Sequence, residues 1–176
     1  MKYSEFLKYA NLVRLDDIRS RLEERDLPEK ILGWRVPVLG AMRLGDLLEL
    51  SEISNEDEAV LTPFRTLLDG SITPDDIGGL DADTVLSFVF QVARQVQRLN
   101  ELFNQEQPEL TSEERQADPP SFGVMGIVDY AMQRFGLSSY DEALRLKAVE
   151  VWQAMHIDNE REAYQRRLRK IYERKK

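Results

Sequence analysis

The chain has 176 residues, a formal net charge of −8 and no cysteine. The lack of thiols excludes disulfide frameworks, thiolate metal sites and cysteine nucleophiles, and a hydrophobic share of 42% excludes disorder of the whole chain. No segment reaches the roughly 18 apolar residues of a membrane span, and the first residues lack the apolar run of a secretory leader, so we expect a cytoplasmic protein with no membrane partner.

The charge is distributed unevenly along the chain. Residues 1–45 hold 9 basic and 7 acidic side chains, residues 46–118 hold 4 and 17, and residues 123–176 hold 11 and 8. The excess of negative charge therefore lies in the middle of the chain. An acidic surface repels nucleic acid, whereas the basic end favours an acidic partner.

The first third of the sequence predicts two helices separated by an irregular segment. Apolar residues at helical spacing predict an amphipathic helix from Ser4 to Arg25, with Ser4 as its N-cap. Two glycines and Pro37 then interrupt any helix, so we expect residues 34–39 to be extended or to form a short strand without an obvious partner. A cluster of leucines predicts a short helix from Leu44 to Ser51.

Two threonine–proline pairs predict helix starts in the next segment. Thr62–Pro63 precedes a short apolar run that Asp69–Gly70 ends, and Thr73–Pro74 repeats the signature. Asp83 is then expected to cap the clearest helix of the protein. The apolar stripe of that helix consists of Val85, Phe88, Val89, Val92, Val96, Leu99 and Phe103.

Residues 104–121 contain three prolines, a surplus of acids and only one large aliphatic side chain, which is typical of a linker. The sequence therefore predicts an all-α, mainly helical fold in three parts. A helical domain spans residues 1–103, a flexible acidic, proline-containing linker spans 104–121, and a small helical segment with a basic C-terminus spans 122–176.

The small C-terminal segment shows clear signals for helix ends. An amphipathic helix beginning near Val124 is expected to stop at Gly136, a residue that readily takes a left-handed conformation. Ser139 and Glu142 have the spacing of a capping box, in which Glu142 reaches back to the amide of Ser139. We expect the helix that they start to continue past Met155 into the basic end.

No group of residues predicts a chemical reaction. His156 is the only histidine, so it lacks the partner imidazoles of typical zinc sites, and we interpret it as a residue on the surface of a helix. Phosphate-binding loops and a GxSxG elbow are absent from the sequence. We therefore predict no catalytic residue, no cofactor and no metal.

Four aspartates lie close together before and at the start of the long helix, at positions 75, 76, 81 and 83. Hard cations such as calcium bind several oxygen ligands from one loop. The spacing of these carboxylates does not match an EF-hand, because the glycine and the closing glutamate fall in the wrong places. Helix caps explain the four aspartates better.

Residues 130–155 have the helix, glycine-containing turn and helix of a DNA-binding helix-turn-helix. The second helix opens with Tyr140, Asp141 and Glu142, whose carboxylates would face and repel phosphates. Residues 165–176 carry seven basic side chains and one acid, which suits nucleic acid, a membrane surface, an acidic protein or simply a solvated helix. A small nucleic-acid-binding regulator using residues 123–155 therefore stays as the alternative function, although nucleic acid is not the favoured partner.

The order of these parts, with the RFG-x-S and EAL-x-L pieces inside residues 127–155, resembles the small tail assembly chaperones of tailed bacteriophages and prophages. In that family an acidic helical domain is followed by a flexible joint and a short helical segment, often added by a frameshift; here both parts lie in one chain. The resemblance implies a non-catalytic cytoplasmic protein of a bacterial host. It implies binding to the tape-measure protein and recruitment of tail-tube proteins, and it leaves a homo-oligomer open.

The resemblance also suggests where a client would bind. Aromatic and apolar side chains in the second helical segment are the candidates for client contact, with packing in the core as the alternative role for each. These candidates are Phe122, Tyr130, Phe135, Trp152 and Met155.

Overall fold

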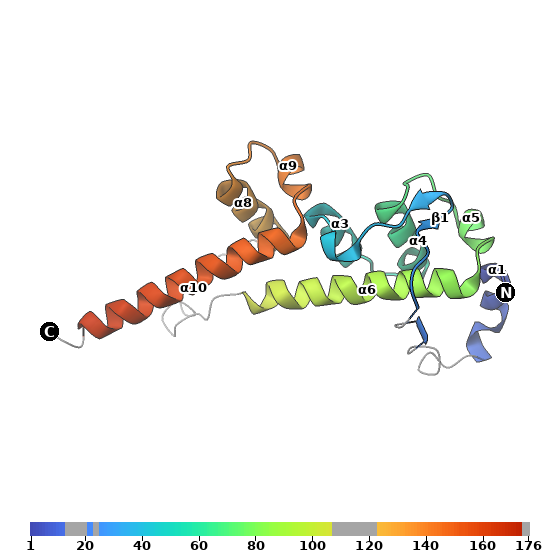
Figure 1. The fold of residues 1–176 in the computed structure, drawn as a ribbon, viewed down its shortest axis with the longest axis horizontal. Helices are drawn as coiled ribbons and strands as arrows, with labels where there is room; N and C mark the ends of the chain where they lie inside the picture. Colours follow the sequence, from blue (N-terminus) through green and yellow to red (C-terminus); the bar gives the residue numbers. More distant parts are fainter. Residues whose placement is uncertain (13–20, 23–24, 107–122, 174–176) are drawn as a thin grey trace. The chain divides into compact units, whose positions relative to one another are not determined.

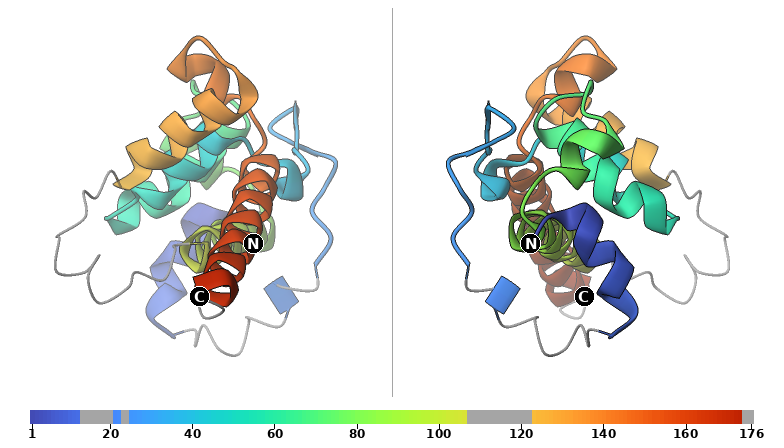
Figure 2. Two further views of the ribbon diagram at one scale, coloured as in Figure 1. Left: turned by 90° about the vertical axis from the view of Figure 1, so that its left-hand side faces the viewer. Right: turned by 90° about the vertical axis from the view of Figure 1, so that its right-hand side faces the viewer.

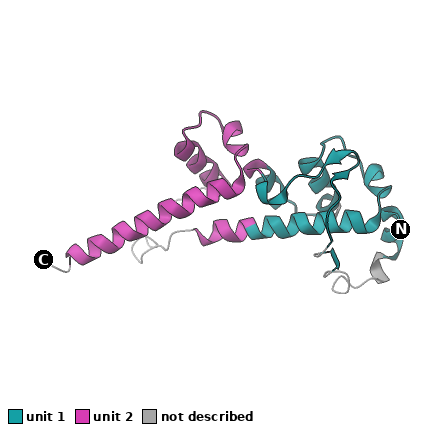
Figure 3. Ribbon diagram, in the orientation of Figure 1, with its two compact units in different colours: residues 1–42, 46–98 teal, residues 43–45, 99–176 magenta. Residues whose placement is uncertain are grey.

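The computed structural model describes residues 1–12, 21–22, 25–106 and 123–173. Helices dominate these residues (Figure 1), so the predicted all-α class is confirmed. The chain divides into two compact units (Figure 3): unit 1 contains residues 1–42 and 46–98, and unit 2 contains residues 43–45 and 99–176. None of the helices in the described ranges has both the length and the apolar character that a membrane span requires.

In the described part of the chain the elements are short helices, one small sheet and two long helices. In the first half they are α1 (Tyr3–Phe6), the 3₁₀ helix η1 (Leu7–Leu12), β1 (Lys30–Ile31), β2 (Trp34–Arg35), the 3₁₀ helix η2 (Leu39–Ala41), α3 (Leu44–Ser51), α4 (Glu56–Leu67) and α5 (Pro74–Gly78). In the second half they are α6 (Ala82–Gln105), α8 (Gly123–Phe135), α9 (Tyr140–Leu144) and α10 (Ala148–Glu173). The predicted short helix from Leu44 to Ser51 is confirmed by α3.

The predicted apolar stripe of α6 is buried except at Val89, which is half-buried. In unit 1 the side chains of Val85, Phe88 and Val92 are at most 1% exposed. The ring of Phe88 packs edge to face on Phe64 of α4, with ring centroids 4.7 Å apart. Complete burial of one such side chain contributes about 1.5–3 kcal/mol, so this stripe supplies a large part of the apolar stabilisation of unit 1.

The chain start pairs with the residues around the beginning of α6. The Tyr3 amide donates to the Leu80 carbonyl at 2.8 Å, and the Ala82 amide donates to the Met1 carbonyl at 2.9 Å. This pairing places Lys2 at the N-cap position of α1, so the predicted N-cap at Ser4 is wrong. Of the predicted helix from 4 to 25, residues 13–20 and 23–24 lie outside the described residues.

The N-cap of α6 is Asp81 rather than the predicted Asp83. The Thr84 amide donates to Oδ2 of Asp81 at 3.3 Å. Asp83 lies inside the first turn, where its carboxylate is 3.1 Å from Arg25 and 3.4 Å from Arg21. Such exposed ion pairs contribute at most about 1 kcal/mol each, and the carboxylate also suits the positive end of the helix dipole.

The helix predicted to start at Thr62–Pro63 begins earlier. Its N-cap is Asn55, whose side chain accepts a hydrogen bond from the Glu58 amide at 2.8 Å. Pro63 therefore lies inside α4, where a proline costs about 3 kcal/mol because it removes a backbone hydrogen bond. The cap and the complete burial of Phe64 offset this cost. The start at Thr73–Pro74 is confirmed by α5, which Thr73 caps.

Residues 30–35 form a two-stranded antiparallel hairpin, in which Lys30 pairs with Arg35 and Ile31 with Trp34. The predicted extended segment at 34–39 is thus a strand only over its first two residues, and its partner directly precedes the turn. The turn residues Leu32 and Gly33 have φ values of 52° and 84°. Two consecutive positive φ values are the pattern of a type I′ turn. The sequence Asn-Gly favours this turn, whereas a leucine in the first of these positions is strained.

We expect Leu32→Asn to raise the free energy of unfolding by about 1 kcal/mol, because asparagine tolerates the left-handed conformation that leucine resists. Chemical denaturation measures the change. Leu32→Ala is the control, since it keeps a Cβ without the side-chain hydrogen bonding of asparagine. Equal stability of the two variants would contradict strain at this turn.

In unit 2, α8 ends as the sequence predicts. Gly136 takes a φ of 65°, and the Leu137 amide donates to the Met132 carbonyl at 2.9 Å. This bond closes the end of the helix and reverses the chain direction. As a result α8 and α9 lie side by side (Figures 1 and 2).

The single helix predicted from Ser139 onward is divided into α9 and α10. Ser139 caps α9 as predicted, since its hydroxyl accepts from the Glu142 amide at 3.3 Å. The Glu142 carboxylate, however, accepts from the amide of Ser138 at 3.0 Å rather than from that of Ser139. These hydrogen bonds from Ser138 hold the pKa of Glu142 below its usual value.

The division between α9 and α10 follows from a long-range backbone contact inside unit 2. The Leu44 amide donates to the Leu146 carbonyl at 2.7 Å, and Arg43 and Lys147 form an antiparallel bridge. A Cβ at Gly45 would lie 3.2 Å from the Leu144 carbonyl oxygen, so this approach requires a very small residue. Local helix signals cannot reveal such a contact, because its two sides lie about a hundred residues apart in the sequence.

The two units do not coincide with the predicted domains at 1–103 and 122–176. Residues 43–45 and 99–105 group with the C-terminal part of the chain. α6 also continues through Asn104 and Gln105, which the predicted linker at 104–121 includes. Residues 107–122 of that linker lie outside the described residues.

Candidate protein-binding surfaces

The residues predicted to contact a client have different environments in unit 2. Phe135 is 40% exposed at the end of α8, whereas Trp152 and Met155 are half-buried on α10. Tyr130 is also half-buried, and its hydroxyl donates to Oδ2 of Asp158 at 2.8 Å. Phe122 lies outside the described residues. Tyr130 thus has a structural role within unit 2, and Phe135 is the most accessible of the four described candidates.

Asp158 joins α8 to α10 through two interactions. Its Oδ2 accepts the hydrogen bond from Tyr130 and lies 2.8 Å from Nε of Arg134, and both of these partners belong to α8. Its Oδ1 lies 3.4 Å from Arg161, which belongs to α10 itself. The hydrogen bond from Tyr130, together with the two guanidinium groups, lowers the pKa of Asp158. Burial and the bond to Asp158 raise the pKa of Tyr130 to about 12.

We expect Tyr130→Phe to lower the free energy of unfolding by about 1 kcal/mol near neutral pH, because Asp158 loses a hydrogen bond. Since the pKa of Asp158 is lowered, this difference is present above pH 3.8 and shrinks as the pH falls below that value. The raised pKa of Tyr130 predicts that its contribution is present below pH 10.0 and lost as the pH rises toward about 12. Ultraviolet titration should lose one high-pKa phenol in the variant; an unchanged titration would contradict this assignment.

His156 lies on α10 with 51% of its side chain exposed, in agreement with its interpretation as a helix-surface residue. Its Nδ1 is 2.8 Å from Oε1 of Glu106, and its ring stacks on Trp152 at a centroid distance of 5.6 Å. Asn159 adds a hydrogen bond to the Glu106 carbonyl at 2.7 Å. The sole histidine therefore helps to hold α10 against the end of α6 inside unit 2, a contact that the sequence did not reveal.

The clustered aspartates act at helix starts. Asp76 accepts hydrogen bonds from the amide and hydroxyl of Thr73 at 2.9 and 2.6 Å, and these bonds lower its pKa. Asp81 caps α6, and Asp83 lies in the first turn of that helix. Within the described ranges, no three acidic or histidine side chains are grouped as they would be around a metal ion.

Unit 1 contains an open groove of about 870 Å³. Its walls come from the chain start, from α4 and from α5, and α1 packs on α5. The lining residues are Lys2, Tyr3, Ser4, Leu7, Val60, Leu61, Pro74, Asp75, Ile77, Gly78 and Gly79. Because the lining residues belong to three separate segments, no local sequence pattern predicts the groove.

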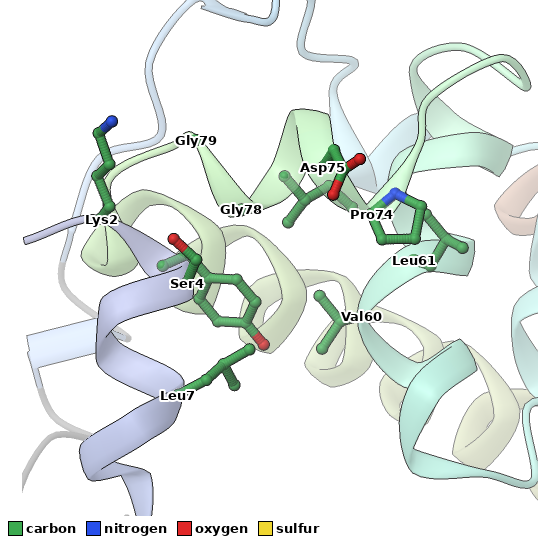
Figure 4. Close-up of a pocket in the computed structure, with 11 residues that line it drawn as sticks. Lys2, Ser4, Leu7, Val60, Leu61, Pro74, Asp75, Gly78 and Gly79 are labelled. Carbon is green, nitrogen blue, oxygen red and sulfur yellow. The ribbon is translucent and has the colours of Figure 1, made fainter.

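The groove is mainly apolar with charged groups at its margin. Ile77 is buried at 2% exposure, whereas Leu7 is 55% exposed. Figure 4 shows Leu7 extending from the side of the chain start toward Val60 of α4. In the same view the charged ends of Lys2 and Asp75 stand on opposite sides of the pocket. An apolar groove with polar margins is the geometry that proteins use to hold an amphipathic helix.

The chain matches no family model, no curated protein and no solved structure. A functional assignment therefore depends on the chemistry of the described surfaces. The groove of unit 1, at about 870 Å³, is much larger than a second pocket of about 60 Å³ beside Leu22 and Leu86.

Proposed function

We propose that this chain is a non-catalytic protein-binding protein that holds an apolar helical segment of a client in the groove of unit 1. The observation that carries the proposal is the size and lining of the groove, about 870 Å³ with Leu7, Val60 and Leu61 facing it. An open groove with apolar walls can take the apolar side chains of an amphipathic helix.

Charge at the margin favours one direction for the bound helix. The N-terminal end of a helix carries partial positive charge and its C-terminal end partial negative charge. A client helix whose N-terminus lies near Asp75 and whose C-terminus lies near Lys2 matches both side chains. Each of these contacts contributes about 0.3–1 kcal/mol, so apolar burial supplies the affinity and charge sets the orientation.

The resemblance to tail assembly chaperones implies a long, helical, apolar client, because those proteins coat the tape-measure protein in the host cytoplasm and recruit tail-tube proteins. We include this role in the proposal. The 17 acidic side chains against 4 basic ones in residues 46–118 would keep such a complex soluble. Neither role requires a catalytic group, a metal or a cofactor.

The nucleic-acid alternative gains less support from the helix-turn-helix-like segment. α9 is only five residues long and carries Asp141 and Glu142 in its first turn, where a recognition helix would meet phosphates. The exposed basic residues of α10 give the strongest support to the nucleic-acid alternative. A gel-shift titration over salt tests it, because phosphate binding weakens steeply as salt rises.

We expect Leu7→Ser to weaken binding of a labelled 18-residue helical peptide with one leucine stripe by about tenfold, because one leucine loses its burial in the groove. Fluorescence anisotropy measures the affinity. Tyr9→Ser is the matched control, since Tyr9 is 56% exposed on the same 3₁₀ helix and does not line the groove. Equal effects of the two substitutions, or equal binding of a peptide with a scrambled stripe, would remove the groove as the binding site.

A second experiment tests the assembly role itself. The chain is co-expressed with the tape-measure protein encoded in the same genome, and the soluble fraction of that protein is measured. We expect the soluble fraction to rise with the original chain and to fall back with Leu7→Ser but not with Tyr9→Ser. Absence of a neighbouring tape-measure gene, or no change in solubility, counts against the chaperone role while leaving peptide binding to be judged separately.

A further inference from the structure

α10 carries two apolar faces on opposite sides of one helix. In its first part Ala148 and Val151 are completely buried, and Trp152 and Met155 are half-buried. At about 100° per residue, these four side chains lie within about 100° of one another around the helix axis. The later apolar residues Ile157, Tyr164, Leu168 and Ile171 occupy an arc centred about 180° away.

The second face, which we call the distal stripe, consists of Ala154, Ile157, Arg161, Tyr164, Leu168 and Ile171. Ile157, Tyr164 and Ile171 are 46%, 53% and 50% exposed. They follow one another at intervals of seven residues, and Ala154, Arg161 and Leu168 form a second row at the same interval. Two rows repeating every seven residues are the pattern of a helix that pairs with another helix.

We propose that the distal stripe pairs in antiparallel orientation with the distal stripe of a second copy of this chain. In an antiparallel pair, each residue of one row faces a residue of the other row. The register that aligns both stripes places Ile157 against Leu168 of the second copy and the small Ala154 against the large Ile171. It also places Arg161 against the ring of Tyr164, an arrangement that provides a cation–π contact.

Charge selects a second copy as the partner and fixes the direction. A parallel pair would place Arg161 directly against its own copy, with like charges in contact. In the antiparallel pair Glu160 lies beside Arg167 of the second copy, twice by symmetry. The stripe thus complements itself in both shape and charge.

This pairing does not depend on the groove of unit 1, since all of its residues belong to α10. The stripe from Ala154 to Ile171 spans 18 residues, or about 27 Å. It is long enough for six facing layers but short for a coiled coil, so the dimer should dissociate on dilution.

Sedimentation equilibrium over a concentration series tests the charge pairing. We expect Glu160→Arg and Arg167→Glu each to weaken the dimer by about tenfold, because each reversal turns two attractions into repulsions. The double variant should recover the original affinity, since the pairs are then restored with opposite sign. Arg166→Glu is the matched control, because Arg166 lies on the opposite side of the helix and should leave the dimer unchanged.

Cross-linking through introduced cysteines tests the register, because the chain contains no cysteine of its own that could form other disulfides. Ile157→Cys and Leu168→Cys chains are mixed and oxidised. A disulfide formed mainly between the two different variants supports the antiparallel register. Disulfides formed mainly within each variant indicate a parallel pair and overturn the proposal.

A chain that stays monomeric at all concentrations also overturns the proposal. Vesicles containing an anionic phospholipid then provide a further arm. Binding of the monomer to them, lost on Tyr164→Glu, would assign the stripe to a membrane surface instead. Circular dichroism of every variant checks that the helix is retained.

Discussion

Burial of one apolar stripe on α6 is the constraint on which the described structure depends. A helix of 24 residues with a continuous apolar face cannot remain alone in water, and the short helices of unit 1 cover that face. The contact between Phe64 and Phe88 shows how strong this requirement is, because it is satisfied although Pro63 interrupts the hydrogen bonding of α4. The groove follows from the same arrangement, since α4 and α5 supply two of its walls.

Local signals in the sequence predicted those features that local physics decides. The caps at Thr73 and Ser139, the stop at Gly136 and the stripe of α6 are all set by residues within one or two turns of each other. Two of the errors arose where distant residues compete with such signals. Pairing of Met1 and Tyr3 with residues around the beginning of α6 moved the start of α1, and pairing of Leu44 with Leu146 separated α9 from α10.

The candidate surfaces were harder to predict than the helices for the same reason. A groove whose walls come from three segments has no sequence motif, so Leu7, Val60 and Leu61 read individually as ordinary apolar residues. Tyr130 and Trp152, by contrast, are conspicuous in the sequence because they are aromatic, yet Tyr130 is tied to Asp158 and Trp152 lies beneath His156. Aromatic residues signal burial as readily as binding, and only their surroundings separate the two.

α10 shows how one sequence pattern can conceal two surfaces. Over the whole helix, the apolar residues are scattered around the axis, because the buried face at Val151 and the exposed face at Tyr164 point in opposite directions. A helix that only had to complete unit 2 would need the first face alone and would place polar side chains at positions 157, 164 and 171. Ile157, Tyr164 and Ile171 instead keep about half of their surface in contact with water, so a partner that covered them would gain from their burial.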